Sequence, residues 1–289
     1  MIKLIASDMD GTLLDSKMQI SAENIAAIKY AQDHGVEFMV ATGRNRPEAL
    51  PPLKSAGIDC AMINLNGAEV FDINGQSLFS VPIEKKTVKK IFDLLNQHDI
   101  YFEVATNHGL FSESEAQRIE KFAGHIAEMM PHLTYKMAVA MTAAHLEFLP
   151  MNYITHLPSL LDDPQIEFLK VIGFGSEDTT SFGTLAKAID DLGDLAVTSS
   201  GSNNIEINHR NAQKGIAVAH VAKERGIELH EVMTIGDNFN DLSMIQLSPV
   251  SFAMANGVME LKEAAAYQTV TNIESGVGKA IRRAIDENL

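Results

Sequence analysis

Short apolar runs alternate with amphipathic segments in the first part of the chain. Residues 2–7, 36–41 and 60–63 are runs of aliphatic and β-branched residues, which predict strands with both faces buried. Helices are expected between these runs, over 22–34 and from about 46 to 55. Strands that alternate with helices through short links predict right-handed crossovers and a parallel sheet.

The last part of the chain repeats this alternation. An Ala-rich helix is predicted to begin at Lys214 and to stop at Gly226, and residues 232–235 and 250–254 are apolar runs typical of strands. Residues 277–287 predict a closing helix. Both ends of the chain are therefore expected to belong to one sheet.

The middle of the chain has a different pattern and is long enough to form a domain of its own. The expected elements are helices near 84–97, 113–129 and 181–192, strands at 101–104, 166–172, 194–199 and 204–207, and an ambiguous apolar stretch at 137–149. We therefore predict an α/β protein whose Rossmann-like parallel-sheet core is formed by residues 1–82 and 209–289, with an α+β insertion at residues 83–208.

The composition narrows the functional classes. The 289 residues carry a formal net charge of -15, which works against non-specific attraction to nucleic acid or to an anionic membrane. The single cysteine, Cys60, excludes an internal disulfide and a cysteine-rich metal cluster. No signal segment or membrane span is recognised, so we expect a soluble cytoplasmic protein without nucleic-acid or membrane partners. The oligomeric state is left open.

Polar side chains follow three of the predicted strands. They are Asp8 and Asp10 after the first strand, Thr42 and Gly43 after the second, and Asp237, Asn238, Asn240 and Asp241 after a late strand. Each group alone is typical of a turn or a helix cap. In an open parallel sheet, however, ligands bind outside the carboxyl ends of the strands, where the strand order reverses. The three groups together therefore indicate one site.

Three carboxylates, those of Asp8, Asp237 and Asp241, are expected to converge at this edge of the sheet. Like charges that lie close together are unfavourable unless a cation compensates them. Mg²⁺ suits a few carboxylate oxygens, waters and a substrate phosphate. Lys214 and the start of the helix that it opens could add positive charge.

Four segments, taken in order, resemble the motifs of the haloacid dehalogenase superfamily of phosphohydrolases. They are Asp8-Met9-Asp10-Gly11-Thr12-Leu13-Leu14, Ala41-Thr42-Gly43-Arg44, Lys214-Gly215, and Gly236-Asp237-Asn238-Phe239-Asn240-Asp241. Arg44 and the segment Asn64-Leu65-Asn66-Gly67-Ala68 are similar to the Cof-type branch (type IIB). Its members carry a large α/β cap between the second and third motifs, so the resemblance implies that the α+β insertion is a cap domain that selects the substrate.

The resemblance also implies a chemistry. Asp8 would be the nucleophile that forms an aspartyl-phosphate, and Asp10 would act first as general acid and then as general base. The implied catalytic residues are Asp8, Asp10 and Lys214; the implied phosphate-binding residues are Met9, Gly11, Thr42, Gly43, Lys214 and Asn240; the implied Mg²⁺ ligands are Asp8, Asp10 through its backbone carbonyl, Asp237 and Asp241. The expected function is an Mg²⁺-dependent phosphatase acting on a small phosphorylated metabolite, either a sugar phosphate or a phosphorylated cofactor.

Other functions fit parts of the sequence. A phosphomutase would use the same residues around the phosphate, and a non-catalytic metabolite-binding regulator could have kept the fold. A phosphonate hydrolase would need a cap lysine, and Lys85, Lys86, Lys89 and Lys90 are spaced more like an exposed helix face. The cap offers candidates for substrate contact without a defined pattern: His108, Tyr135, His145, Tyr153 and His156.

Overall fold

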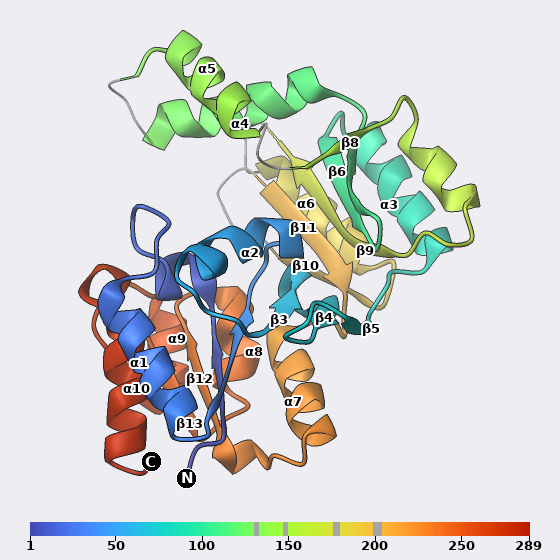
Figure 1. Ribbon diagram of the computed structural model, residues 1–289. Coiled ribbons are helices and arrows are strands. Elements are labelled where there is room, and N and C mark those ends of the chain that lie inside the picture. The colour runs from blue at the N-terminus through green and yellow to red at the C-terminus, as the bar shows by residue number, and fades with distance from the viewer. Residues whose placement is uncertain (130–132, 147–149, 176–179, 199–203) are drawn as a thin grey trace. The chain divides into compact units, whose positions relative to one another are not determined.

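The chain folds into two compact units, shown as a ribbon in Figure 1. The computed structural model describes residues 1–129, 133–146, 150–175, 180–198 and 204–289. The first unit comprises Met1–Val81 and Asn211–Leu289, and the second comprises Pro82–Arg210. Over the described residues, none of the helices has the length and apolar character that crossing a membrane requires.

The first unit is built on one sheet with the strand order β14-β13-β12-β1-β2-β3-β4-β5. The strands are β1 Leu4–Ser7, β2 Glu37–Ala41, β3 Ala61–Asn64, β4 Glu69–Phe71, β5 Ser77–Ser80, β12 Val232–Gly236, β13 Val250–Ala253 and β14 Tyr267–Gln268. Strands β14 to β3 are parallel, while β4 and β5 are antiparallel. The predicted α/β fold with a parallel sheet is confirmed, and the β4–β5 hairpin adds an edge that the sequence pattern did not predict.

The order of the strands reverses at β1. From β1 the chain continues to β2 and β3 on one side, whereas the later strands β12, β13 and β14 lie on the other side. Both immediate neighbours of β1 run parallel to it. The carboxyl ends of β1, β2 and β12 therefore meet at the reversal point, where α/β sheets bind their ligands.

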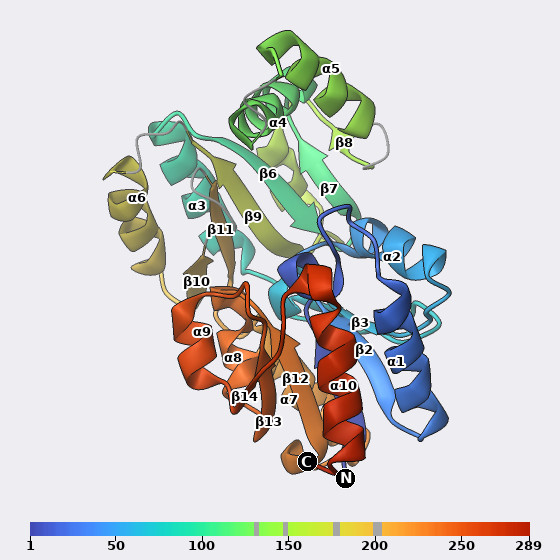
Figure 2. The same cartoon turned by 90° about the vertical axis from the view of Figure 1, so that its left-hand side faces the viewer.

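Helices cover both faces of this sheet. Helices α1 Ala22–Asp33, α2 Arg46–Ser55 and α10 Gly276–Asp286 pack on one face, and α7 Lys214–Glu224 and α8 Leu242–Ile245 pack on the other, while α9 is Met259–Ala264. Alternate residues of β1 face the two layers, with Ile5 in the first and Leu4 and Ala6 in the second. Helices α1 and α10 lie side by side in Figures 1 and 2.

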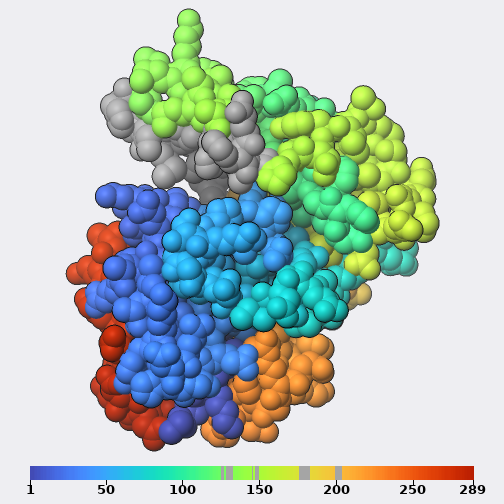
Figure 3. Space-filling view, viewed as in Figure 1, coloured from blue at the N-terminus to red at the C-terminus, as the bar shows by residue number. Residues whose placement is uncertain are grey.

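Local signals in the sequence account for several element ends. The Ser21 side chain accepts a hydrogen bond from the Asn24 N–H at the start of α1. Asn45 and Glu48 form a capping box at the start of α2. In the space-filling view of Figure 3, the β4–β5 hairpin (cyan) lies next to α7 (orange), where the Phe79 and His220 rings are 4.3 Å apart.

The second unit has a separate, mostly antiparallel sheet with the order β10-β11-β9-β6-β7-β8. Its elements are α3 Lys85–Gln97, β6 Tyr101–Thr106, β7 Gly109–Ser112, α4 Glu115–Met129, α5 Tyr135–Leu146, β8 Asn152–Tyr153, β9 Phe168–Phe174, α6 Thr180–Asp190, β10 Leu195–Thr198 and β11 Asn204–His209. The ambiguous stretch 137–149 is helical as far as Leu146, and residues 147–149 lie outside the described residues. Apolar side chains from α3 and α6 cover one face of this sheet.

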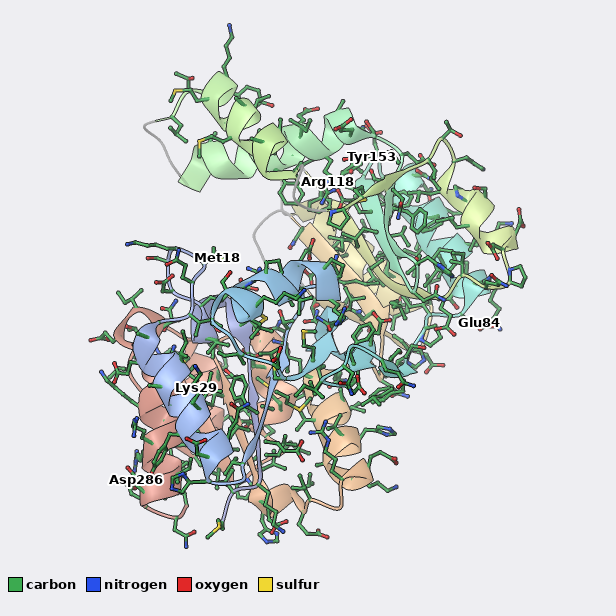
Figure 4. The ribbon with its side chains drawn as sticks, in the orientation of Figure 1. Met18, Lys29, Glu84, Arg118, Tyr153 and Asp286 are labelled. Carbon is green, nitrogen blue, oxygen red and sulfur yellow. The ribbon has the colours of Figure 1, made fainter. Side chains whose placement is uncertain are left out.

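The sheet of the second unit also carries buried charged groups. Arg118, labelled at the start of α4 in Figure 4, has its Nε atom 3.3 Å from a carboxylate oxygen of Glu103 on β6. Lys170 on β9 forms a 2.7 Å ion pair with Glu206 on β11. Removing one partner of such a buried pair leaves an uncompensated charge, so we expect a substitution at any of these residues to destabilise the second unit.

Helices α7 and α8 make their close approach at Gly215. A Cβ atom at this position would overlap the backbone carbonyl of Ser243. We expect Gly215→Ala to lower the free energy of unfolding by about 1–3 kcal/mol, because the two backbones would have to move apart. Unfolding in guanidinium chloride measures this change.

Gly183→Ala is the control for this substitution. Gly183 lies inside the exposed part of α6 and has no atom within 4 Å of a built Cβ. Alanine there should raise stability by about 0.5–1 kcal/mol through helix propensity. An unchanged unfolding midpoint in Gly215→Ala would show that α7 and α8 are not held as closely as described.

Candidate active site

The end of β1 turns sharply after Asp8. The Asp8 N–H donates to the Ile235 carbonyl of β12 at 3.0 Å, which fixes the end of one strand to the other. The chain then enters a tight turn over Met9–Leu13, in which Gly11 has φ +79°. A Cβ at Gly11 would also overlap the Asp237 carboxylate, so glycine is required here for both conformation and space.

The end of β12 is equally crowded. The backbone N–H groups of Asp237 and Asn238 donate to Asp241 Oδ2 at 2.9 and 3.0 Å. The Thr12 hydroxyl donates to Asp237 Oδ1 at 2.7 Å and ties the β12 loop to the β1 loop. These bonds bring the Asp237 and Asp241 carboxylates, four residues apart, to the end of β1.

Lys214 lies between two of the three carboxylates. Its Nζ atom donates to Asp8 Oδ1 and to Asp241 Oδ1, each at 2.6 Å. Lys214 is fully buried and Asp8 is only 4% exposed. Since Lys214 opens α7, the position of this helix sets the position of the ammonium group.

The charges at this site are not balanced by the protein alone. Three carboxylates face one ammonium group. Burial, together with the negative charge of Asp241, raises the pKa of Asp8 well above its usual value. The same two causes raise the pKa of Asp237 to about 6. Burial alone would lower the pKa of Lys214, but Asp241 and Asp8 outweigh it and raise that pKa.

The three carboxylates fit a hard divalent cation. One oxygen from each of Asp8, Asp237 and Asp241 lies within 4.8 Å of the others. Oxygens on opposite sides of an octahedral Mg²⁺ ion are about 4.2 Å apart, so small side-chain movements would complete such a site. Both Asp241 oxygens already accept hydrogen bonds, from Lys214 and from two backbone N–H groups. Asp241 is therefore better placed to orient the site than to be its main ligand.

The residues predicted to bind phosphate lie at the ends of neighbouring strands. Met9 and Thr42 are fully buried at the ends of β1 and β2. A Cβ built on Gly43 would be 3.0 Å from the Asn66 side-chain oxygen, and Asn240 donates to that same oxygen at 3.1 Å. Gly43 and Asn240, far apart in sequence, thus meet at Asn66.

Asp10 lies apart from the other carboxylates. Its side chain is 48% exposed and forms a two-point ion pair with Arg44, at 2.7 Å from Nε and 2.5 Å from Nη2. Arg44 in turn donates through Nη1 to the Glu48 carbonyl at 3.2 Å. Asp8 and Asp10 therefore lie in different surroundings: Asp8 is buried beside Lys214, and Asp10 is open to water.

Sequence reasoning missed three residues that hold this site together. The motifs contain Arg44, Thr12 and Asn66 but imply no role for them. Their places within the motif segments were the only sign in the sequence that they could belong to the site. Their contacts, to Asp10, Asp237 and Asn240, join residues at least 34 positions apart and could not be read from local pattern.

The four lysines considered for phosphonate chemistry, at the start of α3, are not buried. Lys86, Lys89 and Lys90 are exposed, and Lys85 donates to the Asp163 carbonyl. Of the candidates for substrate contact, Tyr135 is 52% and Tyr153 41% exposed, and His108 and His156 are exposed. The side chain of His145 lies outside the described residues.

Known proteins share this arrangement over the whole chain. The family described as haloacid dehalogenase-like hydrolase matches residues 5–281. The chain belongs to this family. It is 31% identical over 293 residues to the Bacillus subtilis phosphatase YwpJ, with 98% of this chain and 100% of that protein covered. It is also 31% identical to the B. subtilis 5-amino-6-(5-phospho-D-ribitylamino)uracil phosphatase YcsE, covering 97% and 95%.

A solved structure agrees with this membership. A haloacid dehalogenase-like hydrolase from B. subtilis superimposes with a TM-score of 0.85 at 30% identity, covering 97% of this chain and 99% of that one. The predicted family is confirmed, and so is the enzyme class. This haloacid dehalogenase-like hydrolase is an enzyme of the phosphatase type.

The charge balance of the site predicts a pH-dependent response to Mg²⁺. The folded-state pKa of Asp237, about 6, lies above the usual value of ~3.9 in an unfolded chain. The metal-free fold therefore holds an extra proton in this window, and the stability that this proton supplies is lost as the pH rises through about 6. A cation that replaces the proton should restore it.

We therefore expect Mg²⁺ to raise the melting temperature more at about pH 7.5 than at about pH 5. Ligand at about 100 times its Kd stabilises a fold by about 2.7 kcal/mol, which is several degrees for a chain of this size. Differential scanning fluorimetry measures the shift. Asp237→Asn should abolish it, while the surface change Asp33→Asn should not. An equal shift at both pH values would contradict this account of the site.

Proposed function

We propose that the chain hydrolyses the phosphate monoester of a small phosphorylated metabolite, with Mg²⁺ as cofactor and an aspartyl-phosphate on Asp8 as intermediate. The observation that carries this proposal is the buried contact of Asp8, Lys214 and Asp241 beside Asp237 at the strand-order reversal. Membership of a hydrolase family with phosphatase relatives supports it.

Asp8 is the candidate nucleophile because of how its two oxygens are placed. Oδ1 accepts from Lys214, which fixes the carboxylate, and the second oxygen would make the attack. A bond forms from this oxygen to phosphorus while the bond from phosphorus to the ester oxygen breaks. In the second half, water attacks the same phosphorus, the bond to Asp8 breaks, and inorganic phosphate leaves.

Asp10 is the candidate proton carrier. It would give a proton to the leaving ester oxygen and then take one from the attacking water. Its exposure to solvent suits this exchange. Both of its oxygens accept from Arg44, so this ion pair would have to open for the carboxyl group to carry the proton. Asp8, in contrast, is buried and cannot exchange protons freely with water.

The remaining predicted residues would hold the transferred phosphoryl group. We propose that the Met9 N–H, Thr42, the Gly43 N–H, Lys214 and Asn240 donate to its oxygens, while Gly11 makes room for the turn. Asp8, Asp237 and the Asp10 carbonyl would be the Mg²⁺ ligands, with Asp241 orienting them. When bound, Mg²⁺ lets a carboxylate approach the negatively charged phosphate and neutralises charge on the phosphoryl oxygens.

The substrate class follows from chemistry and from the relatives. YcsE is named for a ribitylaminouracil phosphate, and YbhA of Escherichia coli, 25% identical over 267 residues, is named for pyridoxal phosphate. We therefore propose a sugar phosphate or a phosphorylated cofactor. A screen of such metabolites for kcat/KM tests this, and turnover of none of them would exclude the class. A phosphomutase would use the same phosphate-binding residues, but the phosphatase relatives favour hydrolysis.

Asp8→Asn should lower the release of p-nitrophenol from p-nitrophenyl phosphate by at least about 1,000-fold, because the amide cannot act as the nucleophile. The assay is run with and without Mg²⁺. Asp33→Asn, the same change on the exposed end of α1, is the control and should keep wild-type activity. Wild-type turnover by Asp8→Asn would rule out the nucleophile, and an inactive wild-type protein would count against the proposed function.

Asp10 and Asp237 should differ in their effect on metal binding. Asp10→Asn and Asp237→Asn should both abolish turnover, but only Asp237→Asn should lose the Mg²⁺-induced rise in melting temperature. The reason is that Asp10 would offer the metal its backbone carbonyl, which the substitution keeps. If Asp10→Asn loses the metal response as completely, the proposed division of roles is wrong.

A further inference from the structure

The loop after β3 has an unusual backbone. Leu65, Asn66 and Gly67 have φ values of 50°, 61° and 105° in succession. A left-handed conformation costs a residue other than glycine roughly 1–2 kcal/mol, with asparagine among the more tolerant residues. Such conformations persist when the surroundings enforce them, and they are concentrated at functional sites.

The surroundings of this loop are the phosphate-binding end of the sheet. The Leu65 N–H donates to the Arg44 carbonyl and the Asn66 N–H to the Thr42 carbonyl, both at 3.0 Å. A Cβ built on Gly67 would lie 2.6 Å from the carbonyl oxygen of Gln213, the residue before Lys214. The loop is therefore held between the end of β2 and the start of α7.

The Asn66 side chain contacts Asn240, in the loop after β12. Its Oδ1 accepts from Asn240 Nδ2 at 3.1 Å and lies 3.0 Å from a Cβ built on Gly43. Asn66 is 6% exposed, so its end of this contact is buried. One buried side chain thus touches two residues to which we assign phosphate oxygens.

We propose that Asn66 is a positioning residue that orients the Asn240 amide toward the phosphoryl group. An amide can turn either its oxygen or its nitrogen toward a ligand, and only the nitrogen attracts an anion. Because Asn66 Oδ1 accepts one Asn240 N–H, the Nδ2 end faces the site and its second N–H is free to donate to phosphate. This inference rests on the proposed function, and it gives a role to the segment Asn64-Leu65-Asn66-Gly67-Ala68.

Asn66→Gly is the most informative variant. Glycine adopts φ near 61° without strain, so the backbone of the loop can be kept while the whole Asn66 carboxamide, with its acceptor oxygen, is removed. We expect kcat/KM on p-nitrophenyl phosphate to fall about 10- to 100-fold, and the inhibition constant of inorganic phosphate to rise about 10-fold. The melting temperature and the Mg²⁺-induced shift should stay within about 2 °C of wild type.

A double-mutant cycle with Asn240→Ala tests the coupling. If Asn66 acts through Asn240, the double variant Asn66→Gly/Asn240→Ala should have a kcat/KM less than about 3-fold below that of Asn240→Ala alone. Asn288→Gly is the matched control, because Asn288 has φ 51° at the exposed end of the chain. It should leave kcat/KM and phosphate inhibition unchanged.

Two results would overturn the proposal: Asn66→Gly within 2-fold of wild-type kcat/KM, or losses from the two sites that multiply in the double variant. If Asn66→Gly fails to fold, Asn66→Asp keeps the acceptor and a tolerant side chain. In the Asn66→Asp variant, Asn240→Ala should lower kcat/KM by the same factor as it does in the wild type. A smaller reduction would also contradict the proposal. Wild-type turnover is measured first, so an inactive enzyme counts against the proposed function and not against Asn66.

Discussion

The buried ammonium group of Lys214 is the interaction on which the first unit depends. It joins Asp8 at the end of β1 to Asp241 beyond β12, and it does so at the first residue of α7. A charge buried in this way is tolerated only when it is paired and hydrogen-bonded. Lys214 must reach Asp8 and Asp241 at 2.6 Å each. These two contacts therefore restrict the position of α7 over the sheet, its close packing on α8 at Gly215 and the spacing of the ends of β1 and β12.

The same contact leaves the site negatively charged. One lysine cannot balance three carboxylates, and the raised pKa values of Asp8 and Asp237 express the unfavourable charge that remains. A fold that needed only stability would replace such a cluster with apolar side chains. The cluster is better explained as a site that a divalent cation and a phosphate complete together, each with the charge that the other requires.

The sequence predicted the fold best where strands are buried on both faces. The runs that became β1, β2 and β3 are continuously apolar because helices cover both sides of the sheet. The β4–β5 hairpin was missed, since its strands have only three and four residues, and β5 at the sheet edge exposes an apolar residue, Leu78, beside a polar one, Ser77. The carboxylates of the proposed site could be predicted because they follow strands, whereas the pairing of Arg44 with Asp10 depends on a long-range contact.

Arg44 helps to keep the side chains of Asp8 and Asp10, in the loop after β1, in different surroundings. Asp8 and Asp10 are two residues apart, yet one side chain is 6% exposed and the other 48%. Gly11, at φ +79°, lets the turn close against Asp237. Arg44 then holds the Asp10 carboxylate on the solvent side, while Lys214 holds Asp8 inside. Each acid thus has its own cation, so the two roles that we propose, attack on phosphorus by Asp8 and proton transfer by Asp10, would rest on two separate ion pairs.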